Sequence, residues 1–73
     1  MGTLRVMGRE GDSKLLWDPE KPESVEQARI KFDELKRKGY LGYAVLGKGK
    51  GALIREFDPA AGEIIMAPPM AGG

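Results

Sequence analysis

The residues best suited to chemistry in this sequence lie at its glycine-rich C-terminal end. Ala71-Gly72-Gly73 surrounds the last carboxylate with almost no side-chain bulk. Some enzymes bind a C-terminal carboxylate in a narrow channel, where it is adenylated and then attacked by a nucleophile. Such a chain end requires glycine, because a β-carbon would make the chain wider and restrict its backbone. A frayed terminus has the same composition. The pattern therefore indicates a transferable acyl group and leaves a frayed end as the alternative.

A second glycine-rich segment, Gly47-Lys48-Gly49-Lys50-Gly51, resembles a phosphate cradle only superficially. A P-loop has the spacing Gly-x-x-x-x-Gly-Lys-Ser/Thr between a strand and a helix, and this segment has neither feature. We interpret it as a hairpin tip that two lysines keep in water. The alternative is a weak contact with phosphate or nucleic acid. Such a contact would use Lys48, Lys50 and Arg55, with Tyr40 or Tyr43 as a stacking surface.

The composition excludes most kinds of catalytic site. The 73 residues include no cysteine and no histidine. This excludes disulfides, zinc fingers, iron–sulfur clusters, thiol nucleophiles and a histidine general base. Most aspartates and glutamates fall in expected turns or on a solvated helix face, without the cleft that an acid/base pair needs. We therefore expect a protein that is not an enzyme and that binds no metal or cofactor of its own.

Charge and hydropathy limit the partners. Twelve basic and eleven acidic residues give a net charge of +1 and are interspersed along the chain, which is typical of a soluble surface and not of a nucleic-acid footprint. The longest apolar runs, such as residues 64–66, are much shorter than the roughly 20 residues of a membrane span. The first residues match neither a secretory signal nor a myristoylation site. We expect a cytoplasmic protein with no membrane partner.

Residues 25–38 form the clearest predicted element, a helix. Its apolar residues recur at helical spacing and make one stripe for the core: Val25, Ala28, Phe32 and Leu35. Ile30 lies off this stripe, so it either covers an edge of the domain or is available to a partner. The expected end signals and ion pairs are an N-cap at Ser24 completed by Gln27, the pairs Asp33–Arg37 and Glu34–Lys38, and a left-handed stop at Gly39.

Strands are expected on both sides of the helix. Alternating or β-branched apolar residues bounded by glycine, proline and aspartate indicate strands at 3–7, 14–17, 40–46 and 52–57, with an optional fifth at 63–67. Within 40–46, large residues alternate with the small Gly42 and Ala44. The small side would let a helix approach closely, so the pattern leaves open which side is buried.

This order, ββαββ(β), predicts a single α+β domain over residues 1–67 and a tail over 68–73. The helix must bury its stripe on one face of a mixed sheet, and crossovers are right-handed. The simplest arrangement places the first strand beside and parallel to a strand of the second hairpin. That arrangement is the β-grasp. A ferredoxin-like fold would need a second helix, and residues 58–62 are too few to supply one.

With this element order and the terminal Gly72-Gly73, the chain resembles the ubiquitin-like proteins, including their prokaryotic relatives and the sulfur carriers. The resemblance extends over nearly the whole chain in element order, but it is not a residue-level match. The segment between the helix and the last strand is shorter than in ubiquitin, and Pro68, Pro69, Met70 and Ala71 replace the basic tail. These departures indicate a divergent member of prokaryotic or phage type.

The resemblance implies a protein modifier whose Gly73 carboxylate is activated with ATP by an E1-like enzyme. The acyl group would then pass to an isopeptide bond, with an E2-like enzyme or a JAB-type peptidase as further partners, or become a thiocarboxylate for sulfur transfer. ATP would be used by the activating enzyme, and Pro68, Pro69, Met70 and Ala71 would carry tail recognition.

Two other functions stay open. One is a non-conjugated interaction module that uses Ile30, strand edges or the Pro-Pro segment, and Ile30, Lys48 and Lys50 are the partner surface that the sequence suggests. The other is a weak nucleic-acid binder through Lys48, Lys50 and Arg55, whose affinity would fall steeply with salt.

Overall fold

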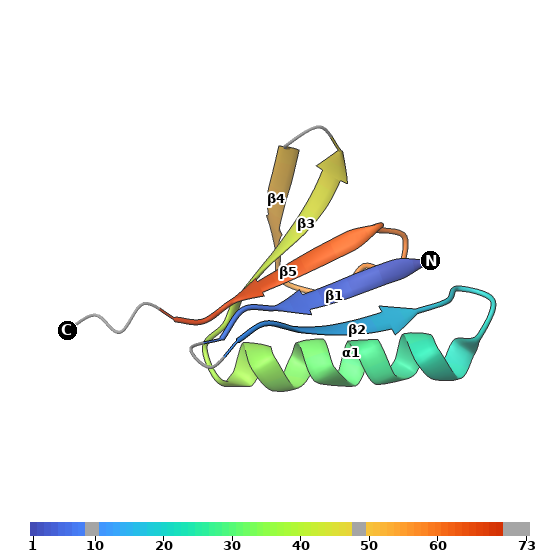
Figure 1. Cartoon of the computed structure of the whole chain (residues 1–73), viewed down its shortest axis with the longest axis horizontal. Helices are drawn as coiled ribbons and strands as arrows, with labels where there is room; N and C mark the ends of the chain where they lie inside the picture. The colour runs from blue at the N-terminus through green and yellow to red at the C-terminus, as the bar shows by residue number, and fades with distance from the viewer. Residues whose placement is uncertain (9–10, 48–49, 70–73) are drawn as a thin grey trace.

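The computed structural model describes residues 1–8, 11–47 and 50–69. It shows a mixed sheet with a single helix packed on one face (Figure 1). The predicted order of elements is confirmed, and the optional fifth strand is present. The elements are β1 (Gly2–Val6), β2 (Ser13–Trp17), α1 (Pro22–Arg37), β3 (Leu41–Gly47), β4 (Lys50–Ile54) and β5 (Glu63–Ala67).

The last strand, β5, lies at the centre of the sheet. The strand order is β2-β1-β5-β3-β4. β1 is parallel to β5, whereas the β1–β2, β3–β4 and β3–β5 pairs are antiparallel. The prediction that the first strand pairs with the second hairpin is therefore wrong, because β5 lies between them. Ile64, Ile65 and Met66 make β5 apolar on both faces, which suits a central strand. The arrangement is compatible with a β-grasp.

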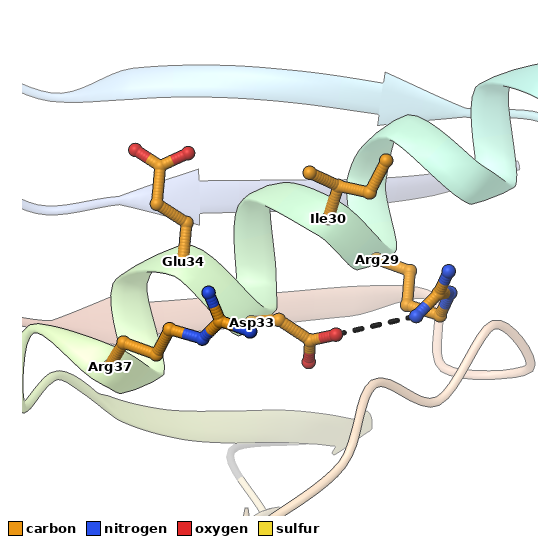
Figure 2. A pocket seen from close by; sticks show the side chains of 5 residues that line it. All are labelled: Arg29, Ile30, Asp33, Glu34 and Arg37. Atoms are coloured by element: carbon orange, nitrogen blue, oxygen red, sulfur yellow. Dashed lines mark hydrogen bonds and ion pairs between the residues drawn. The ribbon is translucent and has the colours of Figure 1, made fainter.

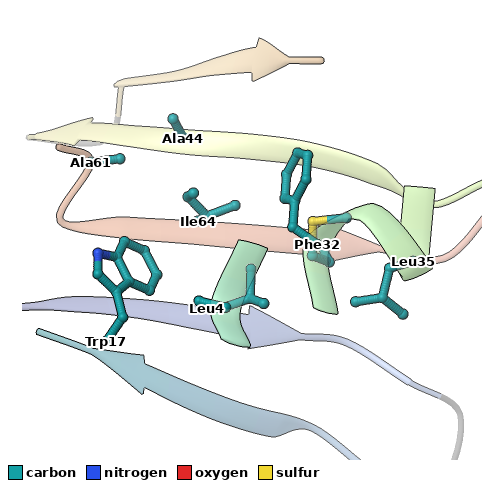
Figure 3. Close-up of a cluster of buried hydrophobic side chains, with 9 residues drawn as sticks. Leu4, Trp17, Phe32, Leu35, Ala44, Ala61 and Ile64 are labelled. Atoms are coloured by element: carbon teal, nitrogen blue, oxygen red, sulfur yellow. The ribbon is translucent and has the colours of Figure 1, made fainter. Parts of the chain in front are cut away.

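The hydrophobic core lies between α1 and one side of the sheet, which we call the covered face (Figure 3). The helix contributes Ala28, Phe32 and Leu35, as the apolar stripe predicted. Phe57, in the segment after β4, closes one end with edge-to-face contacts to Trp17 and Phe32, at centroid distances of 4.9 and 6.1 Å. The sheet residues buried on this face are Leu4, Trp17, Ala44, Ile64 and Met66.

Small residues decide which side of β3 the helix covers. Gly42 and Ala44 are buried on the covered face, whereas Leu41 and Tyr43 are exposed on the other side. A Cβ added to Gly42 would lie 2.8 Å from Cε2 of Phe32, closer than atoms in a packed core tolerate. The question that the sequence left open is thus answered: the helix packs where the side chains are smallest.

The start of the helix differs from the expected one. Lys21 occupies the N-cap position without a side-chain cap, and Pro22 opens the first turn, where a missing N–H costs nothing. The capping box of Ser24 and Gln27 is therefore wrong. The Ser24 hydroxyl instead accepts a hydrogen bond from the Asp18 N–H at 2.8 Å and donates to the Lys21 carbonyl oxygen at 2.8 Å. It fixes the connection from β2 to α1.

The helix ends at a glycine, as predicted. Gly39 has a φ of +96°, and its N–H donates to the Lys36 carbonyl while the Tyr40 N–H donates to that of Leu35, both at 3.0 Å. These two bonds form a Schellman motif. The Glu34–Lys38 pair is present at 3.7 Å. The other predicted pair differs, because Asp33 contacts Arg29 at 3.3 Å.

Candidate binding surfaces

The segment predicted as a tail follows β5. Pro68 and Pro69 follow Ala67 and are exposed. A Cβ added to Gly39 would lie 3.6 Å from Cβ and Cγ of Pro69, so the chain passes against the turn that ends α1. The other predicted tail residues, Met70, Ala71, Gly72 and Gly73, lie outside the described residues.

The lysine-rich hairpin is described only at its edges. Lys48 lies outside the described residues, and of Lys50 only the backbone, at the start of β4, is placed. Arg55 follows β4 and is exposed. The two tyrosines separate: Tyr40 packs against the core, whereas Tyr43 is exposed on the side of the sheet away from α1.

Ile30 lies beside a shallow hollow on the outer side of α1 (Figure 2). The hollow has a volume of about 330 Å³ and is lined by Arg29, Ile30, Asp33, Glu34 and Arg37. Arg29 contacts the carboxylates of Glu26 and Asp33. The hydrogen bond and charge of Glu26 raise the pKa of Arg29, and the charge of Asp33 adds to this effect. Arg29 is thus paired with two carboxylates, and Ile30 is the one apolar residue among the charged side chains that line this hollow.

The other face of the sheet is the larger exposed apolar surface, and we call it the open face. No element among the described residues packs on it. Strand register places one residue of each strand in a row across it, because Arg5 is opposite Lys14 and Ile65, and Tyr43 is opposite Ile65 and Leu53. We call this the central row: Lys14, Arg5, Ile65, Tyr43 and Leu53. Leu16 and Leu41 flank it on the same face.

One ion pair lies on the open face beside the central row. Nε of Arg5 is 3.2 Å from Oε2 of Glu63, but this nitrogen is buried and has no hydrogen-bond partner among the described residues. The contact is therefore coulombic and not a directed hydrogen bond. Lys14, at the β2 end of the row, is exposed and forms no ion pair with any described residue.

Sequence reasoning did not single out the open face as an exposed apolar surface. The signal was the alternation of Leu41, Tyr43 and Val45 with Gly42 and Ala44. In most strands the large apolar residues lie on the buried side. In β3 the small residues are buried instead, because the helix packs close to them. Of the residues that sequence reasoning selected, Ile30 lies on the outer side of α1. Lys48 and the side chain of Lys50 lie outside the described residues.

Within the described residues, no group of histidine, cysteine, aspartate or glutamate side chains could hold a metal ion. No helix in that part of the chain is both long and apolar enough to cross a membrane. Comparisons with protein families, curated proteins and solved structures gave no match to this chain.

Proposed function

We propose that this chain is a ubiquitin-like β-grasp protein that serves as a protein modifier, with Gly73 activated by an E1-type enzyme for conjugation or sulfur transfer. The observation that carries the proposal is the strand order β2-β1-β5-β3-β4 with β1 parallel to β5. It places the strand that precedes the tail at the centre of the sheet. Together with Gly72-Gly73 in the sequence, this strand order supports a stable domain followed by a C-terminal acyl group without bulky side chains.

A central last strand suits a tail that a partner enzyme must pull into a channel. β5 is hydrogen-bonded to β1 on one side and to β3 on the other. A force on the tail would have to break both ladders, whereas a strand at the edge would peel away from one. Pro68 and Pro69 then fix their own φ values, and Pro69 lies against Gly39. Pro68 and Pro69 thus leave the sheet at a defined point, beside the turn that ends α1.

The chemistry would take place on the partner. The Gly73 carboxylate attacks the α-phosphate of ATP, which gives an acyl-adenylate and releases pyrophosphate. A partner cysteine thiolate then displaces AMP to form a thioester, and a lysine amine displaces the thiolate to form an isopeptide bond. In the sulfur branch, hydrosulfide from a sulfide-level donor attacks the acyl carbon and displaces AMP, and loss of its proton to solvent leaves a thiocarboxylate. This chain supplies the acyl group and a recognition surface and is not an enzyme.

Intact-mass analysis of the tagged protein incubated with host lysate and ATP tests the proposal. We expect ATP-dependent adducts, or a mass gain for the exchange of one oxygen by sulfur, and we expect both to disappear when Gly72 and Gly73 are deleted. A Gln27→Ala variant, changed at an exposed position of α1, serves as a control that keeps the tail. Absence of ATP-dependent products from the intact chain, or their survival after the deletion, would remove the modifier assignment.

The second candidate is a non-conjugated interaction module, and the exposed apolar open face is the observation that favours it. A module of this kind should keep its partner after deletion of Gly72 and Gly73, because its contacts lie on the sheet. Measurement of partner binding by the truncated chain therefore separates the two candidates. A modifier would lose its activation in the same experiment.

A further inference from the structure

We propose that the chain forms a dimer with a second copy of itself, in which the two β4 strands pair antiparallel about a two-fold axis at Ala52. Lys50 of each copy would then lie near Glu56 and Asp58 of the other. The proposal concerns one edge of the sheet and goes beyond the proposed function, because it does not depend on the chemistry of the tail.

The first argument is that β4 is an unprotected edge strand. It is the last strand in the order β2-β1-β5-β3-β4, and only β3 pairs with it among the described residues. Natural sheets protect such edges with charged residues, prolines or a covering helix. At the other edge, β2 carries the exposed Lys14 and lies against α1 (Figure 1). Residues 51–54 of β4 contain neither a charge nor a proline, and α1 does not run along the outer edge of this strand.

The second argument is the self-complementary shape of β4. With the axis at Ala52, each of the five residues of β4 has a partner, and Leu53 of one copy is opposite Gly51 of the other. Among the described residues, a Cβ added to Gly51 would meet only the Ala44 carbonyl oxygen, at 3.6 Å. There is thus space for a side chain over Gly51. Leu53 is 59% exposed, and covering Gly51 in both halves of the dimer would remove its apolar area from water.

The third argument is charge, which favours antiparallel pairing over parallel pairing. A lysine, Lys50, is the first residue of β4, and two carboxylates, those of Glu56 and Asp58, follow its end. Both carboxylates are exposed and form no ion pair with any described residue. Antiparallel pairing brings the basic end of one strand to the acidic end of the other, whereas parallel pairing in register would place like charges side by side. The favoured arrangement is a closed, two-fold dimer.

A shallow hollow at the end of β4 provides a place for the lysine. The hollow has a volume of about 500 Å³ and is lined by Ile54, Arg55, Glu56, Phe57 and Asp58. In the proposed register, Lys50 of the second copy is opposite Ile54, at the margin of this hollow. A lysine there can pack its apolar stem on Ile54 and place its ammonium group near the carboxylates. Arg55 can balance only one of the two.

A second copy fits this edge better than an unrelated extended segment. Any segment can form backbone hydrogen bonds with a free edge strand. To match β4 as well, a segment would need a large apolar residue opposite Gly51 and a basic residue near Glu56. The β4 strand of a second copy supplies both, with Leu53 and Lys50.

Sedimentation velocity of the full chain over a concentration series tests the proposal. The interface of one strand pair is smaller than about 1,200 Å², which is typical of weak complexes. We therefore expect a monomer at about 10 µM and a dimer at about 1 mM, and we expect added salt to weaken the dimer. In the ¹⁵N-labelled chain, dilution should shift the amide signals of residues 51–54 and leave those of β2 and of the outer side of α1 unchanged.

Charge-reversal variants make the test specific. Lys50→Glu and Glu56→Lys each place like charges together at both ends of the strand pair, so each should weaken the dimer about tenfold. An equimolar mixture of these two variants should recover the dimer, because residues 50 and 56 then have opposite charges at both ends. Lys14→Glu makes the same charge change on β2 and is the matched control, which should dimerise as the native chain does. Thermal melts of dilute samples verify the fold of each variant.

Loss of Leu53 tests the apolar contact. Leu53→Ser should weaken the dimer about tenfold, the usual effect of losing an interface anchor. Four outcomes would overturn the proposal. They are a chain that stays monomeric at about 1 mM, assemblies that grow beyond two copies, concentration-dependent shifts on β2 or α1 in place of β4, and a mixture of the two charge variants that dimerises no better than either alone. The first outcome would assign the edge to an extended segment of another protein.

Discussion

The two faces of the sheet place similar residues in opposite environments. On β5, Ile64 is completely buried under α1, whereas its neighbour Ile65 is partly exposed on the open face. On β3 the sizes are inverted, since Gly42 and Ala44 face the helix and the larger Leu41 and Tyr43 do not. In this small domain, therefore, apolar character alone does not mark the core. The covered face is the one whose shape lets the helix approach.

Because the larger residues of β3 face away from the helix, their apolar side chains stay exposed to water. Turning larger side chains toward α1 would separate the helix from the sheet, because Gly42 lies under the ring of Phe32. The chain therefore packs its helix closely and retains an exposed apolar face.

Truncation of the two neighbouring isoleucines of β5 should give the largest difference between the faces. Ile64→Ala opens a cavity in the core and should lower the free energy of unfolding by about 2–5 kcal/mol. Ile65→Ala removes a partly exposed side chain and should cost about 1 kcal/mol. Urea denaturation followed by tryptophan fluorescence measures both, because Trp17 is buried in the core. Equal losses would show that the open face is also part of the core.

Addition of one methyl group to each side tests close helix approach. Gly42→Ala should lower the free energy of unfolding by about 1–3 kcal/mol, since its Cβ would meet Phe32 at 2.8 Å and Sδ of Met66 at 3.2 Å. Phe32 is fully buried and has little room to move. Among the described residues, a Cβ added to Gly51 on β4 meets only the Ala44 carbonyl oxygen, at 3.6 Å. The effect of Gly51→Ala should therefore stay within about 0.5 kcal/mol. Denaturation midpoints for the pair decide whether α1 and β3 are in close contact.

Substitution of Ser24 tests the connection from β2 to α1, which positions the helix on the covered face. Ser24→Ala should cost about 1–2 kcal/mol, because it leaves the Asp18 N–H without its acceptor. The matched change Gln27→Ala, at an exposed position of the same helix, should change the free energy of unfolding by less than about 0.5 kcal/mol. Equal destabilisation of the two variants in thermal melts would instead support the capping box of Ser24 and Gln27 that the sequence predicted.

Local rules predicted the elements of this fold, but the sheet order required long-range information. The stripe from Val25 to Leu35 and the stop at Gly39 gave the helix, because helical spacing and positive φ are properties of short segments. The central position of β5 was missed, because Ile64, Ile65 and Met66 show that a strand is buried without showing between which partners. The helix start was misplaced because Ser24 bonds to Asp18, in the preceding turn, and not to the first turn of the helix.

The candidate sites were predicted less well than the elements. Pro68 and Pro69 are exposed after β5, and the tail over residues 68–73 stays a prediction. Gly72 and Gly73 lie outside the described residues. The open face was missed because it combines residues from five strands. Tyr43 and Lys14 are far apart in the sequence, and only the strand register places them in one row.

Leu53→Ser has the smallest expected effect on stability, so it best separates a role in packing from a role in binding. Leu53 and Ile54 are neighbours on β4 that point to opposite faces, and Ile54 packs against the core. Leu53→Ser should leave the free energy of unfolding within about 0.5 kcal/mol of the native value, whereas Ile54→Ser should lower it by more than about 1 kcal/mol. Leu53→Ser should also weaken the proposed dimer, although its urea midpoint in dilute solution is unchanged. A loss of stability in that variant as large as in Ile54→Ser would make the apolar residues of the open face structural, and the reason to expect a partner there would disappear.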